Sequence, residues 1–180
     1  MHQRPGHSPS DTVFHDRERR VLIAGDHLLG HISSNPLITR PRDGTSERPQ
    51  ALVQYLDSLA ATREMDFELA LPGHGDEVKG ARELIDKRLR LHRRRADKIL
   101  RLIAERPRTA YEIARELWAE LAVTQAYLTL SEVLGHLDLL LNDGRAQELE
   151  REGLSVFQAA APDPRAPGRA RPRRPGNRAT

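Results

Sequence analysis

Three residues of metal-ligating type lie in or beside glycine turns in the first half of the chain. His7 lies in PGHSPSD, Asp26 follows the apolar run VLIAG, and His74 lies in LALPGHG. Imidazole nitrogens and carboxylate oxygens suit zinc or iron. Glycine beside a ligand lets the backbone approach a metal without a Cβ clash. Alone, a Pro-Gly-His or a Gly-Asp is usually only a turn or a cap, so the order of the three motifs carries the hypothesis.

The elements that position these residues can be predicted from hydrophobic spacing. The apolar run 21–24 predicts a buried strand that ends at Asp26, and FELAL (67–71) predicts a second strand that leads to His74. Between them, residues 49–62 have the apolar spacing of an amphipathic helix. Residues 1–16 are rich in turn signals. This order predicts an α/β layer with polar side chains at its strand ends, where sites tend to lie.

The second half of the chain is predominantly helical. A long helical stretch begins near Ala81 and ends before Pro107, and its apolar stripe drifts near His92, which leaves open a break into two helices. Thr109 and Glu112 then form a capping-box pattern. A further apolar helix stops at Gly144, and residues 145–159 show a strand, a Glu-Gly turn and a strand. Three helices followed by a hairpin predict a winged-helix arrangement.

Composition limits the class of protein. The isoelectric point near 9.7 is set mainly by residues 161–180, which carry six arginines and one aspartate, so an argument for nucleic-acid binding depends on this tail alone. The tail has no large apolar residue and is expected to be disordered. The chain has no cysteine. No signal peptide is expected, because the first 25 residues lack an apolar run of that kind, and no membrane span is expected. A cytoplasmic protein is the expectation.

The motifs together resemble those of the metallo-β-lactamase-fold hydrolases. PGHSPSDTVF, VLIAGDHLL and LALPGHG look like three consecutive motifs of that family. The helices and hairpin after LPGHG, with GDHLLGHISSNP and VLGHLDLLLNDGRA, look like its β-lactamase-like-protein-2 branch. The resemblance implies an α/β fold, a partial αββα sandwich over residues 1–80. An α+β winged-helix unit over 81–158 and an Arg/Pro-rich tail over 159–180 would follow.

The resemblance also implies roles for the three residues. His7 matches the third histidine of the first metal site, Asp26 the catalytic aspartate that bridges both metals, and His74 the histidine of the second metal. The implied cofactor is one or two zinc ions, with iron as the other choice. The implied reaction is hydrolysis of a thioester, ester or phosphodiester by a metal-bound hydroxide.

One departure from the family is large. The His-x-His-x-Asp-His motif, which supplies the other ligands, does not occur in these 180 residues. Each metal would keep two protein ligands, whereas catalytic zinc normally has three. The chain is therefore expected to be the C-terminal portion of a hydrolase, truncated and weakly active or inactive by itself. Its strands around Leu22 and Leu69 are expected to lack part of their cover. The alternatives are a non-catalytic binding module and a winged-helix nucleic-acid binder that uses the basic tail.

Other polar residues have two interpretations each. His27 and His31 are expected at the surface or in contact with the metal ligands. His136 is expected to make a hydrogen bond in the core or between units, in preference to binding a metal. Arg93, Arg94 and Arg95 form either a solvated helix face or a phosphate contact for a small-molecule or RNA-like substrate. Sequence-specific DNA binding is not expected, because the helix before the hairpin is acidic.

Overall fold

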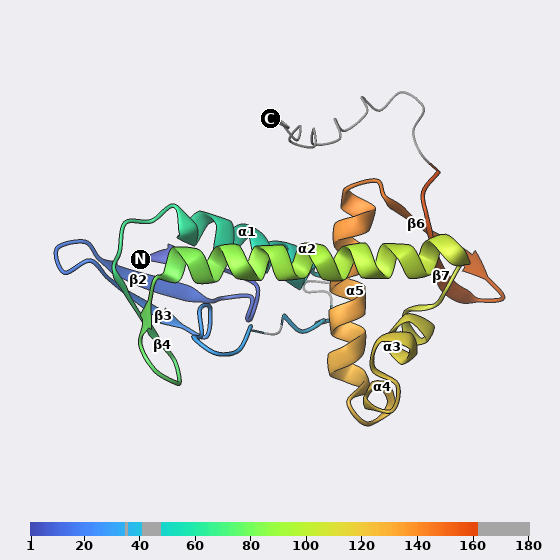
Figure 1. Ribbon diagram of the computed structural model, residues 1–180, viewed down its shortest axis with the longest axis horizontal. Coiled ribbons are helices and arrows are strands. Elements are labelled where there is room, and N and C mark those ends of the chain that lie inside the picture. The colour runs from blue at the N-terminus through green and yellow to red at the C-terminus, as the bar shows by residue number, and fades with distance from the viewer. Residues whose placement is uncertain (35, 41–47, 162–180) are drawn as a thin grey trace, which may run out of the picture.

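The computed structural model describes residues 1–34, 36–40 and 48–161. The first part of the chain forms a five-stranded sheet in the order β1-β2-β3-β4-β5 (Figure 1). Within it, β3 and β4 run parallel and the other neighbours run antiparallel. The strands are β1 (His2–Gln3), β2 (Thr12–Asp16), β3 (Val21–Gly25), β4 (Leu69–Pro72) and β5 (Val78–Lys79).

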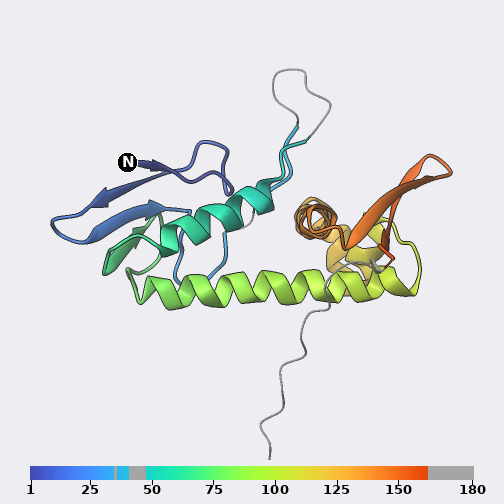
Figure 2. The same cartoon turned by 90° about the horizontal axis from the view of Figure 1, so that it is seen from above.

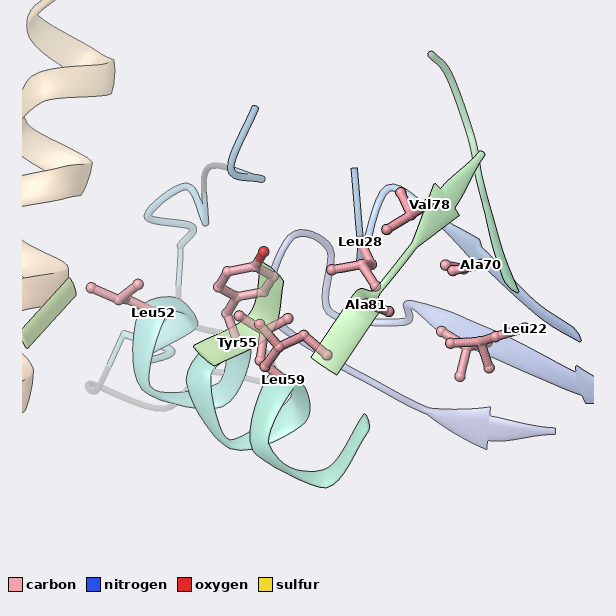
Figure 3. Close-up of a cluster of buried hydrophobic side chains, with 11 residues drawn as sticks. Leu22, Leu28, Leu52, Tyr55, Leu59, Ala70, Val78 and Ala81 are labelled. Carbon is pink, nitrogen blue, oxygen red and sulfur yellow. The ribbon is translucent and has the colours of Figure 1, made fainter. Parts of the chain in front are cut away.

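Helix α1 (Ala51–Arg63) lies in the connection between β3 and β4 and covers one face of the sheet. A crossover of this kind is what allows the two strands to run parallel. Leu52, Tyr55 and Leu59 on α1 pack in one buried cluster with Leu22 and Ala70 on the strands (Figure 3). The strands predicted before Asp26 and before His74, and the helix between them, are confirmed.

The opposite face of the sheet carries an apolar stripe that no described residue covers. Phe14, Ile23 and Leu71 are register partners on β2, β3 and β4, and they are 50%, 53% and 38% exposed. Leu22 is fully buried. The strands around Leu22 and Leu69 therefore lack part of their cover, as predicted, at Ile23 and Leu71. Leu22 itself is covered because successive side chains of a strand point to opposite faces.

Helix α2 (Ala81–Glu105) is continuous, so the break considered near His92 does not occur. The apolar stripe drifts because the helix serves two cores: Ile85 packs in the sheet cluster, whereas Ile99 and Ile103 pack in a second cluster. Figures 1 and 2 show α2 running along most of the molecule, with the sheet near one end and the hairpin near the other.

The second part of the chain packs around that second cluster. Its elements are α3 (Ala110–Trp118), α4 (Leu121–Thr124), α5 (Ala126–Asn142), β6 (Ala146–Arg151) and β7 (Leu154–Ala159). The predicted capping box is confirmed, since Thr109 and Glu112 exchange both bonds at the start of α3. The predicted hairpin is also confirmed. Arg108 makes a β-bridge with Phe157, with N···O distances of 2.8 and 3.0 Å, and this bridge ties the hairpin to the loop before α3.

The two parts of the chain are held together by polar and close-packed contacts. Arg48 donates two hydrogen bonds of 2.6 and 2.7 Å to the buried Asp138 carboxylate. On α5, Gly135 lies so close to α1 that a Cβ would be 2.8 Å from Cβ of Leu52. Within the described ranges, no helix is long and apolar enough to cross a membrane.

Several elements differ from the sequence predictions. Residues 1–16 contain β1 and β2, and residues 78–79 form β5, although the sequence predicted turns or gave no signal there. The short helix α4 was also not predicted. The pairing of Ala159 with Ala146 extends one residue past the predicted boundary at 158. Residues 162–180, which make up most of the predicted tail, lie outside the described residues.

Candidate metal centre

Asp26 is positioned by the ends of the two parallel strands. It follows Gly25, the last residue of β3, whose carbonyl accepts a 2.9 Å hydrogen bond from the Gly73 amide just beyond β4. A Cβ on Gly73 would lie 2.4 Å from Asp26 Oδ1, so a larger residue there would displace the carboxylate from this position. The Ser34 hydroxyl donates to the backbone carbonyl of Asp26. The carboxyl ends of parallel strands meet at one sheet edge, and this places Asp26 next to the His74 turn.

His7 reaches the same edge from the loop between β1 and β2. Asp11 holds this loop by accepting hydrogen bonds from the amide and hydroxyl of Ser8, at 2.8 and 2.6 Å. Ser58 on α1 donates to the carbonyl of Pro5 at 2.8 Å. Gly6 is required because a Cβ there would lie 2.4 Å from Cα of Tyr55. The glycine of this turn therefore lets the loop pack on α1.

The structure brings the three predicted ligand residues together. Nε2 of His7 lies 3.7 Å from Oδ2 of Asp26, and Nε2 of His74 lies 3.6 Å from Oδ1. Each imidazole thus faces a different oxygen of one carboxylate. All three side chains are partly exposed to solvent. Their predicted convergence is confirmed, whereas metal binding by them stays a prediction.

His27 anchors the loop that carries Asp26 to helix α1. Its ring is buried, Nε2 lies 2.9 Å from the Thr62 hydroxyl, and its carbonyl accepts a 3.3 Å hydrogen bond from Tyr55. Burial, with a smaller contribution from the Arg4 charge, lowers the pKa of His27 to about 4, so this imidazole is neutral at pH 7. His27 is therefore not a surface residue.

His31 lies beside the His74 turn. A Cβ on Gly75 would meet its ring at 2.6 Å, and Gly75 also has a positive φ of 82°. His31 is exposed. Its ring covers the backbone of the residue that follows His74, and its predicted contact with the ligands stays a prediction.

Sequence reasoning missed Arg88, which anchors the loop after Asp26. This residue of α2 is buried and donates to the backbone carbonyls of Leu29 and Ile32. The sequence offered only one indication: Arg88 lies three residues after Ile85, on the same face of the helix. A buried guanidinium needs acceptors, and these two loop carbonyls accept from Nη2, whereas Nη1 is buried without a partner among the described residues.

Arg93, Arg94 and Arg95 do not form one patch. Arg94 and Arg95 line a cavity of about 250 Å³ with Trp118, and Arg93 lines a separate one of about 540 Å³ near Asp143. Arg95 is already paired with Glu132, and its guanidinium lies 5.8 Å from the centre of the Trp118 ring. Phosphate contact by these arginines stays a prediction.

Parts of this chain are similar to known proteins. Residues 2–74 match the family model of the metallo-beta-lactamase superfamily. The chain is 37% identical over 137 residues to the "Probable metallo-hydrolase YqjP" of Bacillus subtilis, a match that covers 76% of this chain and 42% of the relative. The first part of the chain is a mixed α/β unit that resembles part of a metallo-β-lactamase fold.

Two solved structures show the same likeness over most of the chain. A beta-lactamase domain protein from Burkholderia ambifaria has a TM-score of 0.75 and 32% identity, over 87% of this chain and 46% of its own length. A metallo-beta-lactamase family protein from Thermus thermophilus has a TM-score of 0.71 and 24% identity, over 87% of this chain and 47% of its own length. This chain therefore spans a little under half of the metallo-β-lactamase-fold proteins that it matches.

Proposed function

We propose that the chain supplies one side of a two-metal hydrolytic centre in a metallo-β-lactamase-fold hydrolase. The observation that carries the proposal is the placement of the Asp26 carboxylate between His7 and His74, with one imidazole at each oxygen. A carboxylate with a different imidazole at each oxygen is suited to bridge two cations, whose mutual repulsion it offsets. The bond cleaved would be a thioester, an ester or a phosphodiester.

The three residues fit a zinc or iron pair. In a tetrahedral zinc site, two ligand atoms lie about 3.3 Å apart. The two Nε2–carboxylate distances, 3.7 and 3.6 Å, are close to this spacing. A ligand histidine commonly donates its other ring hydrogen to a partner, and His7 Nδ1 is buried without one among the described residues, so that partner would come from outside them. When bound, the metals would supply Lewis acidity and make water a stronger nucleophile at neutral pH.

These residues alone give each metal two protein ligands. Because a hydrolytic zinc normally has three, the remaining ligands would come from residues outside this sequence. The apolar stripe of Phe14, Ile23 and Leu71 is where a second layer of an αββα sandwich would pack. We expect residues 1–180 by themselves to bind metal weakly at Asp26 and to turn over little substrate.

Residues 81–158 would cover the substrate or form a surface on which it docks. We propose a winged-helix unit here, in a cytoplasmic enzyme that acts on a small-molecule or RNA-like substrate. The acidic residues Glu132 and Asp138 on α5 are already paired with Arg95 and Arg48. This arrangement favours α5 as a structural helix over a DNA-reading helix.

A chimera tests the proposed function. The chain would replace the matching segment of the Bacillus subtilis relative, which supplies the rest of that fold, and zinc-dependent turnover would be measured on ester, thioester and phosphodiester probes. Asp26→Asn should lower kcat at least about a hundredfold, since it removes the carboxylate shared by both metals. Glu68→Gln, at an exposed position away from the site, is the matched control.

An active chimera whose turnover is unchanged by Asp26→Asn would contradict the proposed role of the carboxylate. A folded chimera that binds substrate analogues without turnover would instead favour a non-catalytic binding module.

A further inference from the structure

A second cluster of metal-ligating side chains is buried where α2 crosses α5. His92 comes from α2, and Glu132 and His136 come from one face of α5, four residues apart. His92 is 3% exposed and His136 is 0% exposed. One ligand atom from each residue lies within 4.8 Å of the other two. The cluster lies apart from Asp26 and has no role in the proposed hydrolysis.

The contact between the two imidazoles needs either a hydrogen or a metal cation between the two facing nitrogens. Nδ1 of His136 lies 2.7 Å from the backbone carbonyl of Glu132, so Nδ1 carries a hydrogen and Nε2 carries a lone pair. That lone pair faces Nδ1 of His92 at 3.2 Å. Either a proton on His92 or a metal cation must therefore lie between the two nitrogens.

A proton satisfies only part of the cluster. If Nδ1 of His92 carries the hydrogen, then Nε2 of the same ring is a bare acceptor. This Nε2 is buried and has no hydrogen-bond partner among the described residues. A buried acceptor without a donor is costly, so a hydrogen at Nδ1 leaves this ring incompletely bonded. An ion at Nδ1 would place the hydrogen on Nε2 instead, so the argument for a metal rests on the spacing of the ligand atoms.

We propose that His92, Glu132 and His136 bind one divalent metal ion of the zinc class, which joins α2 to α5. The nitrogen–nitrogen distance of 3.2 Å is close to the about 3.3 Å expected for two ligands of one tetrahedral ion. A glutamate and a histidine one turn apart on one helix, completed by a residue of a facing helix, is a known way to build metal sites between helices.

The surroundings of the cluster suit this role. His136 donates its other ring hydrogen to a backbone carbonyl, as metal-binding histidines commonly do. Glu132 is paired with Arg95 through Oε1, and the same oxygen lies 3.8 Å from Nδ1 of His136, so the carboxylate would turn toward the facing nitrogens to complete the site. Burial lowers the pKa of His92 to about 4 and lowers that of His136, so both rings are neutral and can act as ligands at pH 7.

The number of protein ligands predicts which of the two sites binds metal more tightly. One ion at the buried cluster would have three protein ligands, whereas each ion at Asp26 would have two. The first equivalent of metal added to residues 1–180 should therefore bind at the cluster. This inference does not rest on the proposed hydrolase function.

Cobalt titration of the intact, metal-free chain tests the proposal, because tetrahedral Co²⁺ has strong visible absorption bands. The wild-type chain and the Asp26→Asn variant should each bind one equivalent with these bands. Glu132→Gln keeps the shape of the side chain but removes a charged ligand, and it should weaken cobalt binding at least about tenfold. His136→Gln should abolish the bands.

Circular dichroism of the metal-free variants provides the folding control. If His136→Gln does not fold, Glu132→Gln carries the test, since its side chain is partly exposed and isosteric with the original. The proposal is overturned if Glu132→Gln binds cobalt as tightly as the wild-type chain. It is equally overturned if Asp26→Asn, rather than the cluster variants, removes the tetrahedral bands.

Discussion

At the scale of single residues, glycine determines how closely the site loops can approach their neighbours. Gly6 lies against the backbone of Tyr55, and Gly73 lies against the carboxylate of Asp26. In both places a Cβ would be only 2.4 Å from an existing atom, so the turn and its neighbour would have to move apart. The glycines of the Pro-Gly-His turns therefore have a packing role that holds whether or not a metal is bound.

Gly6→Ala should destabilise the chain strongly. The new Cβ would collide with main-chain atoms of α1 and the residue would keep a positive φ of 149°, so we expect the free energy of unfolding to fall by about 3 kcal/mol. Gly30→Ala is the matched control, because its nearest atom would be 3.5 Å away, and it should change stability by less than about 0.5 kcal/mol. Urea denaturation measures both, and equal effects would show that the Gly6 contact is not tight.

The candidate ligands could be predicted from the sequence, but their neighbours could not. His7, Asp26 and His74 belong to local motifs with recognisable turns. His92 belongs to no such motif. It is a single histidine in a basic helix, and its role depends on packing against His136, which lies 44 positions away in the sequence. The partnership of His27 with Thr62 depends in the same way on packing between distant segments.

At the scale of elements, helices were easier to predict than strands. The apolar spacing and the Thr109 capping box define α1, α2, α3 and α5 within the sequence itself. Strands β1 and β5 have two residues each, and their existence depends on pairing with β2 and β4 rather than on local pattern. The continuity of α2 could not be predicted because its apolar stripe changes face between two cores.

The joint between α5 and the segment before α1 depends on the ion pair between the half-buried Arg48 and the buried Asp138. Arg48→Met would leave the Asp138 carboxylate buried without its cation, and we expect a loss of about 3–5 kcal/mol in the free energy of unfolding. The double variant Arg48→Met/Asp138→Leu should recover most of this loss, since it leaves no unpaired charge. Chemical denaturation of the two variants and the wild type checks this. If the double variant were as unstable as the single one, packing rather than charge would control the joint.

At the scale of the whole molecule, the two parts of the chain meet through buried polar groups. His92 and His136 lie at the crossing of α2 and α5, and His27 lies under α1. Burial is the main cause that keeps the pKa of each below the ordinary value of 6.5. Acid should therefore weaken the joint between the two parts and the sheet core together.

The metal-free chain should lose stability as the pH falls from 6.5 toward 4. In this window the unfolded chain binds protons that the folded chain excludes, so the free energy of unfolding rises with pH and levels off above 6.5. Each of His27 and His92 can contribute up to about 1.4 kcal/mol per pH unit. Urea denaturation in the presence of EDTA measures the slope between pH 5 and 6.5. His27→Gln should reduce this slope by about 1 kcal/mol per pH unit, and an unchanged slope would contradict a buried, neutral His27.

Magnetic coupling between two metal ions tests the central claim most directly. In the chimera with the Bacillus subtilis relative, loaded with Mn²⁺, a carboxylate shared by two ions should give the electron paramagnetic resonance spectrum of a spin-coupled pair. The single ion proposed at His92 cannot give that signal. Asp26→Asn should remove the coupling while leaving the chimera folded. A coupled pair that persists in Asp26→Asn, or a wild-type chimera that binds only isolated ions, would contradict the assignment of Asp26 as the bridge.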